Sequence, residues 1–143
     1  MNKRIFALIT ILVILAVAVA YGNDMQTAIR NADKKLKANH FLLTDEIDEI
    51  YEKEKTPDVL EKISIDQQKA IVEELKTAKE INAQKSLGFG SSIKDPLEQA
   101  VYQDGVLNNM MLKSSREIAK KYGIKAGDVF YIELNLMAEN LNW

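Results

Sequence analysis

The 143-residue chain contains no cysteine, two prolines, six glycines and one histidine. Without cysteine there can be no disulfide, no thiolate metal site and no cysteine nucleophile, so stability must come from packing. Because proline and glycine are scarce while Lys, Glu, Ala, Leu and Ile are abundant, local preference favours helix along nearly the whole chain. The sequence therefore predicts an all-α protein.

Residues 1–22 carry the clearest signal. Lys3 and Arg4 form a short basic start, and the seventeen residues 5–21 are apolar or aromatic apart from one threonine. A secretory signal has a basic start, an apolar stretch and a small-x-small cleavage site, which Ala18-Val19-Ala20 supplies. A single membrane span needs about 17 to 25 apolar residues. Both interpretations stay open: an uncleaved single-pass anchor, which the length of the run favours, or a signal peptide cleaved near Ala20.

The basic start also predicts a location. Positive residues stay on the cytoplasmic side, so residue 23 onward is expected outside the cytoplasm, at the cell membrane or, after cleavage, periplasmic or secreted. We expect residues 1–22 to be signal or anchor and residues 23–143 to form one extracytoplasmic helical domain. Without Lys3 and Arg4 the chain has 17 basic and 21 acidic residues, a mildly acidic balance that argues against a nucleic-acid partner.

Periodicity and capping signals divide the rest of the chain into helices. Met25, Ile29, Ala32 and Leu36 fall on one face of a helix over residues 24–39. The helices expected next cover residues 44–55 with Thr44 as N-cap and residues 56–63. Ser64 or Asp66 then starts a helix that runs to residue 87, followed by a loop over residues 88–92.

The second half contains more ambiguous signals. Asp95-Pro96 opens a helix, and the turn dipeptide Asp104-Gly105 predicts a kink or break in it, since glycine costs about 1 kcal/mol in a helix interior. A capping box at residues 114–117 predicts a new helix that Gly123 ends. Residues 129–143 alternate like a strand but also step like a helix; the helical pattern covers more residues, so we expect a helix capped by Asp128. The expected fold is an N-terminal membrane-spanning or signal helix followed by a compact bundle of about five or six short helices.

Two patterns suggest chemistry and have simpler interpretations. Residues 116–138 are similar in spacing to a helix-turn-helix unit, but Phe130, Tyr131 and Glu133 are poor choices against phosphates and bases, so we expect a packed helical corner. Six acidic residues in positions 45–54 could hold a cation, yet no glycine-containing calcium loop is present, so we expect a solvated face and no metal. These residues are Asp45, Glu46, Asp48, Glu49, Glu52 and Glu54.

Catalytic patterns are scarce. His40 is the single histidine, and no Gly-x-Ser-x-Gly elbow accompanies it, so we expect it to be a helix-end residue. No catalytic residue, cofactor site or metal site is predicted.

One short stretch resembles a known family. Ile63-Ser64-Ile65-Asp66-Gln67 is similar to the Leu-Thr-x-x-Gln signature of the periplasmic stress-chaperone and metal-resistance sensor group, and residues 43–46 resemble a second copy in which Ile47 replaces the glutamine. The match covers about ten of 143 residues. The resemblance implies a helical dimer that binds unfolded chains or metal at the cell envelope.

The leading functional hypothesis is a non-catalytic module that binds a protein partner at the envelope through an apolar groove between amphipathic helices. Alternatives are the small stress chaperone or metal sensor that the resemblance implies, and a hydrolase with paired carboxylates. Long apolar side chains are candidate contacts, although such residues pack in the core more often than they face a partner. The candidates are Phe89, Tyr102, Met110, Met111 and Trp143.

Overall fold

The computed structural model describes residues 24–140, and within them it contains six helices and no strand. A helix over residues 24–38 is followed by α2 (Thr44–Lys53), α3 (Val59–Lys62), α4 (Ile65–Ser86), α5 (Pro96–Tyr122) and α6 (Ala126–Glu139). The predicted all-α bundle is confirmed. The predicted signal or anchor and the candidate contact Trp143 lie outside the described residues. None of the helices in residues 24–140 combines the length and the apolar character that crossing a membrane requires.

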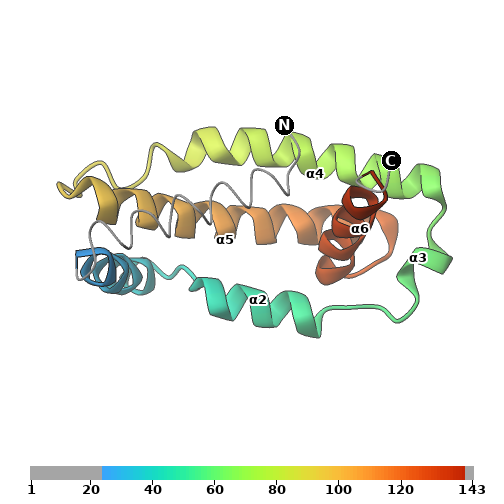
Figure 1. Cartoon of the computed structure of the whole chain (residues 1–143), viewed down its shortest axis with the longest axis horizontal. Coiled ribbons are helices and arrows are strands. Elements are labelled where there is room, and N and C mark those ends of the chain that lie inside the picture. Colours follow the sequence, from blue (N-terminus) through green and yellow to red (C-terminus); the bar gives the residue numbers. More distant parts are fainter. Residues whose placement is uncertain (1–23, 141–143) are drawn as a thin grey trace.

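The helices run in two directions (Figure 1). The long helices α4 and α5 lie side by side and antiparallel, and α2 runs along the other side of α5. The helix over residues 24–38 and α6 run crosswise to them near opposite ends of the bundle. Because α5 contacts α2, α4 and α6 and packs against the helix over residues 24–38, it is the central element of the fold.

Capping residues explain where the two long helices begin and end. The Ser64 hydroxyl accepts from the backbone N–H of Gln67 at 3.3 Å, and the Gln67 side chain accepts from the Ser64 N–H at 3.2 Å, a reciprocal capping box. These are the residues that resemble the Leu-Thr-x-x-Gln signature. Asp95 caps α5, with Pro96 as its first residue, and Gly123 at φ 68° ends it.

The sequence predicted a kink or a break at Asp104-Gly105. A break there is wrong, because α5 continues through these two residues. Gly105 is buried, and a Cβ built on it would lie 2.4 Å from Cδ1 of Leu36. Glycine is therefore present because the helix over residues 24–38 packs against the α5 backbone. On that crossing helix Ala28, Ala32 and Leu36 are buried, whereas Ile29, predicted on the inner face, is exposed.

The capping box expected at residues 114–117 is also wrong, since these residues lie inside α5. The two serines instead face neighbouring helices. The Ser114 hydroxyl accepts from the Asn82 amide at 2.9 Å, and the buried Ser115 hydroxyl lies 3.3 Å from the Tyr51 hydroxyl. Serine within a helix is tolerated here because each hydroxyl has a partner on another helix.

Three other boundaries differ from prediction. Thr44 is the first residue of α2 and not its cap; the Glu46 carboxylate accepts from the Leu43 N–H at 2.7 Å. The short helix expected over residues 56–63 is only α3, because Asp58 has a positive φ of 58°. The helix expected after Asp128 is confirmed but begins earlier, at Ala126. Asp128 lies in its first turn, where the carboxylate accepts from the Lys125 N–H at 2.8 Å.

The core consists of three clusters of buried side chains. The one between α3, α4, α5 and α6 contains Val59, Ile63, Ile71, Leu75, Ile118, Ala119, Val129 and Ile132. A second, where residues 24–38 cross α5, contains Ala32, Leu36, Tyr102 and Val106. A third, between α2, α5 and α6, contains Ile47, Leu112 and Ala126.

Candidate interaction surfaces

Three of the candidate contacts predicted from the sequence lie in or against one aromatic cluster. Phe41 contacts Phe89 and Tyr102 edge-on, with ring centroids 6.1 and 6.5 Å apart. Tyr102 is buried, Met110 packs against the same cluster, and Phe89 is at its exposed edge. These side chains hold the α4–α5 loop against the segment after residue 38, which is a structural role.

Met111 lies elsewhere, against the largest of the three core clusters, where its sulfur accepts from the Asn82 amide at 3.5 Å. The prediction that these methionines form a binding surface remains untested, but both are half-buried. Long apolar residues in a chain of this size pack inside more often than they face a partner.

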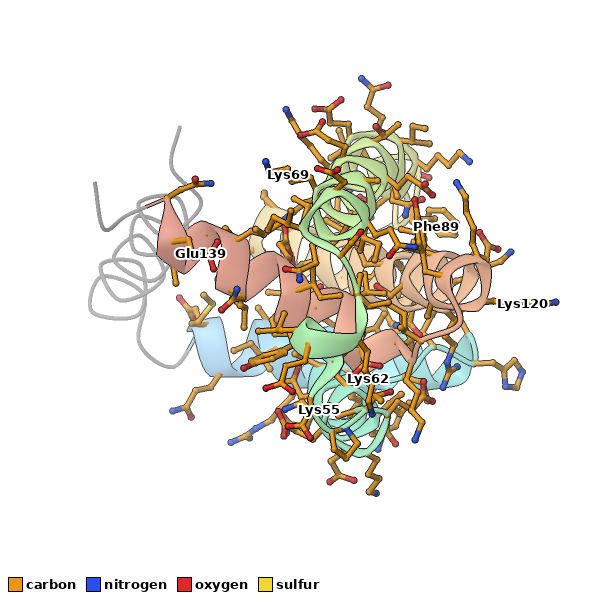
Figure 2. All side chains as sticks on the ribbon, turned by 90° about the vertical axis from the view of Figure 1, so that its right-hand side faces the viewer. Lys55, Lys62, Lys69, Phe89, Lys120 and Glu139 are labelled. Carbon is orange, nitrogen blue, oxygen red and sulfur yellow. The ribbon has the colours of Figure 1, made fainter. Side chains whose placement is uncertain are left out.

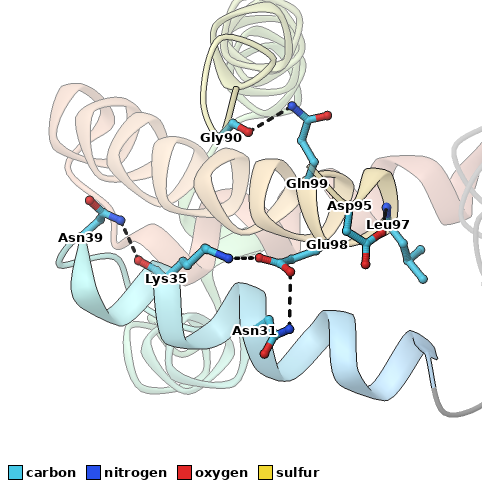
Figure 3. Close-up of polar contacts among 8 residues, drawn as sticks. All are labelled: Asn31, Lys35, Asn39, Gly90, Asp95, Leu97, Glu98 and Gln99. Carbon is cyan, nitrogen blue, oxygen red and sulfur yellow. Dashed lines mark hydrogen bonds and ion pairs between the residues drawn. The ribbon is translucent and has the colours of Figure 1, made fainter. Parts of the chain in front are cut away.

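A polar cluster fixes the helix over residues 24–38 on α5 (Figure 3). The carboxylate of the buried Glu98 accepts from the ammonium of Lys35 and, at 3.5 Å, from the amide of Asn31. Close by, the Gln99 amide donates to the Gly90 carbonyl at 3.1 Å and so holds the α4–α5 loop. All of these donors and acceptors are used within the fold, so the cluster is a joint between elements.

Two acidic residues of α2, Glu49 and Glu52, also have local partners. Glu49 pairs with Lys53 at 3.3 Å, and Glu52 pairs with Lys55 at 2.8 Å, both on the exposed surface. Within residues 24–140 no three His, Cys, Asp or Glu side chains lie close enough together to hold a metal ion. His40 follows the helix over residues 24–38 with a φ of 63°, at the helix end as predicted.

An open groove of about 550 Å³ runs between α4 and α5. Ala78 and Ile118 form its apolar base, and Ile81, 49% exposed, adds an apolar side chain that water can reach. Glu73 and Glu117 are exposed at its edges. Its remaining lining residues are Glu74, Thr77, Ser114 and Lys121.

A charge cluster closes one end of this groove. The Glu74 carboxylate accepts from the Lys121 ammonium at 2.5 Å and from the Tyr122 hydroxyl at 2.7 Å. The hydrogen bond from Lys121 and then that from Tyr122 lower the pKa of Glu74, and the same carboxylate raises the pKa of both partners. Glu74 therefore stays ionised and Lys121 stays charged across the neutral range, which suits neither of them for proton transfer.

A second groove, of about 470 Å³, lies between residues 40–42 and α5 and shares Glu117 with the first. It has a basic wall formed by Lys113, Arg116 and Lys120, although Arg116 is paired with Glu54 at 2.7 Å. At its base, the Asn109 amide group accepts from the Leu42 N–H and donates to the Leu42 carbonyl.

A third surface lies where α6 meets α2. The rings of Tyr51 and Phe130 stack at 5.6 Å, and Phe130, Tyr131 and Leu134 remain between 44 and 46% exposed. Burial raises the pKa of Tyr51, while the hydrogen bond with Ser115 opposes that shift. Sequence reasoning did not nominate these residues, although the order of Val129, Phe130, Tyr131 and Ile132 contained the signal: with Val129 and Ile132 buried, two adjacent aromatic residues must face outward.

The chain matches no known family, no curated protein and no solved structure in sequence or fold comparisons. Its function must therefore be argued from its own surfaces.

Proposed function

We propose that this chain is a non-catalytic protein-interaction module of the cell envelope. Residues 5–21 anchor it in the membrane, the helical domain lies outside the cytoplasm, and the groove between α4 and α5 binds a segment of a protein partner. The groove supports the proposal because it combines an apolar base, an exposed isoleucine and charged edges, as grooves that take amphipathic segments do.

The charges of the groove indicate the chemistry of the partner. Among the residues that the structure describes, Glu73 and Glu117 form no ion pair, whereas Glu74 and Lys121 neutralise each other. A segment with an apolar anchor beside Ile81 and basic side chains beside the two free carboxylates would complement this surface. Exposed carboxylates at the edge contribute mainly to selectivity and to the association rate.

The chain offers a matched pair for the test. Ile81 and Ile65 are the same residue type on the same helix and are both 49% exposed, but only Ile81 lines the groove. A photoreactive phenylalanine analogue is placed at position 81 or at position 65 of the full chain. Each variant is expressed in the organism whose genome encodes the protein, so that the natural partner is present. We expect a discrete covalent adduct with another protein from position 81, and none from position 65.

Charge reversal then tests the partner chemistry. In the chain labelled at position 81, Glu117→Lys should reduce the adduct several-fold, because it replaces an attractive carboxylate with a like charge. Asp66→Lys, on the exposed start of α4 outside the groove, is the control and should leave the adduct unchanged. Equal adducts from positions 81 and 65, or no adduct from position 81, would show that the groove is not the binding site.

A further inference from the structure

The groove between residues 40–42 and α5 is basic, although the chain carries a net charge of -2. Lys113, Arg116 and Lys120 line it, and Glu117 is the one acid among its lining residues. Lys113 and Lys120 are exposed, and neither forms an ion pair within residues 24–140. Lys120 points away from the bundle in Figure 2, so this wall is open to an approaching molecule. Unneutralised ammonium groups in a groove favour an anionic occupant.

The spacing of the bases indicates what kind of anion fits. Lys113 and Lys120 are seven residues apart on α5, which is about 10 Å along the helix axis. A single small anion is held best by donors that converge on one point. Bases spread along two turns of a helix instead match a segment that carries acids at the same intervals.

One exposed segment of this chain has acids in that arrangement. Along α2 three exposed acids follow one another at steps of four and three residues, whereas the bases along α5 follow at steps of three and four. The acids are Asp45, Glu49 and Glu52, and the bases are Lys113, Arg116 and Lys120. With the two helices antiparallel, each acid therefore lies opposite one base. The buried Ile47 holds the other face of α2 on the core, so the acids face outward.

Within one chain α2 and α5 run in the same direction, so the two charge orders do not match intramolecularly (Figure 1). The Asn108 amide donates to the Thr44 hydroxyl at 3.4 Å at the start of α2, and Glu54 at its end pairs with Arg116 at 2.7 Å. A two-fold axis perpendicular to both helices reverses them in a second copy. The α2 helix of that copy then meets α5 of the first copy antiparallel, and the same operation places the first α2 on the second α5.

We propose that two copies of this chain associate through such a two-fold contact, with α2 of each copy at the basic groove of the other. The inference is independent of the membrane anchor and of the α4–α5 groove. The local ion pairs of Glu49, Glu52 and Arg116 do not oppose it, because pairs this exposed contribute little and exchange partners easily. Since the contact is made by exposed charges, the association is weak and sensitive to salt.

Charge exchange between copies tests the contact. Full-length chains that carry two different affinity tags are co-expressed, and the second tag is measured in detergent extracts after purification through the first at low salt. The groove variant carries Lys113→Glu with Lys120→Glu, and the α2 variant carries Asp45→Lys with Glu52→Lys. The matched control is Lys69→Glu with Lys76→Glu, which reverses two exposed lysines of α4 at the same spacing and outside both grooves.

We expect each variant paired with itself to reduce co-purification several-fold, because like charges then meet in both contacts. The groove variant paired with the α2 variant should restore it, since each contact again joins opposite charges. Restoration also shows that both variants fold. The control should co-purify as the unchanged chain does.

Three results would overturn the inference: unchanged copies that do not co-purify, a loss that the mixed pair does not restore, or an equal loss in the control. A different protein that is retained by the unchanged chain and lost with the groove variant, while copies stay separate, would assign the groove to an acidic segment of that protein and also overturn it. The adducts from position 81 test the proposed function separately.

Discussion

The two crosswise helices each meet the bundle at a buried glycine, but the atoms opposite those glycines differ. A Cβ on Gly105 would lie 2.4 Å from a methyl carbon of Leu36, the end of a flexible side chain. A Cβ on Gly127 would lie 2.1 Å from the carbonyl oxygen of Tyr51 and 2.4 Å from that of Glu54. A leucine side chain can change rotamer, whereas the backbone at the end of α2 cannot shift without losing its hydrogen bonds. The crossing of residues 24–38 is therefore adjustable, and the α2–α6 joint is rigid.

The buried carboxylates at the two joints differ in the same way. Glu98 is held by the side chains of Lys35 and Asn31. Asp128 accepts from two backbone N–H groups, those of Thr56 at 2.6 Å and Lys125 at 2.8 Å. Side-chain donors can reorient, while backbone donors fix the position of the chain. One end of the bundle therefore tolerates rearrangement better than the other.

The largest effect is expected from Gly127→Ala. The new methyl group collides with backbone oxygens and displaces the hydrogen bond from the Gly127 N–H to the Glu54 carbonyl, 2.8 Å long. We expect the free energy of unfolding to fall by about 3 kcal/mol or more. Chemical denaturation followed by circular dichroism measures the loss. A decrease below about 1 kcal/mol would contradict the rigid joint.

Gly105→Ala should cost less, roughly 1 kcal/mol net, because overpacking against Leu36 is partly offset by the better helix propensity of alanine. A double-mutant cycle sharpens the comparison. Leu36→Ala alone should cost about 2–5 kcal/mol, but in its background Gly105→Ala should become neutral or stabilising. If the stability losses of Gly105→Ala and Leu36→Ala simply add in the double mutant, Leu36 is not the side chain that excludes a Cβ at position 105.

The smallest effect concerns pH and the Glu74 cluster between α4 and α5. Hydrogen bonds from Lys121 and Tyr122 lower the pKa of Glu74 below its ordinary value of 4.5. Its contribution to stability is therefore complete above pH 4.5 and is lost as the pH falls through the lowered pKa. Glu74→Gln should slightly reduce stability at neutral pH and flatten its acid dependence. The measurement is the Tm of the unchanged protein and of Glu74→Gln at several pH values. If both Tm values fall equally as the pH is lowered, Glu74 does not have this role.

Local signals predicted much of the fold. The signals at Asp95-Pro96 and Gly123 correctly placed the two ends of α5, and the helix expected to start at Ser64 or Asp66 and to run to residue 87 is α4. These features depend on neighbours within a few positions. The errors at Gly105 and Ser114 have the opposite origin, because glycine and serine signal a turn locally but here accommodate a partner helix distant in sequence.

The candidate surfaces were less predictable. Tyr102 and Met110 were nominated for their size and apolarity, properties that do not distinguish the core from a contact surface. The exposure of Ile81 depends on how α4 packs against the other helices that the structure describes, which follows from tertiary arrangement alone. The exposure of Phe130 and Tyr131 on α6 follows from the sequence only when the segment is known to be a helix and Val129 and Ile132 are known to be buried.

Ile118 has two neighbours of different kinds. It forms part of the base of the α4–α5 groove and also packs with Val129 and Ile132 of α6 in the core. The wall between a ligand and the hydrophobic core is thus a single side chain in thickness at this point. Binding of a partner in the groove would therefore be coupled to the packing of α6 against Ile118. The free energy by which a bound partner stabilises the packed α6 equals the free energy by which the packed α6 strengthens binding.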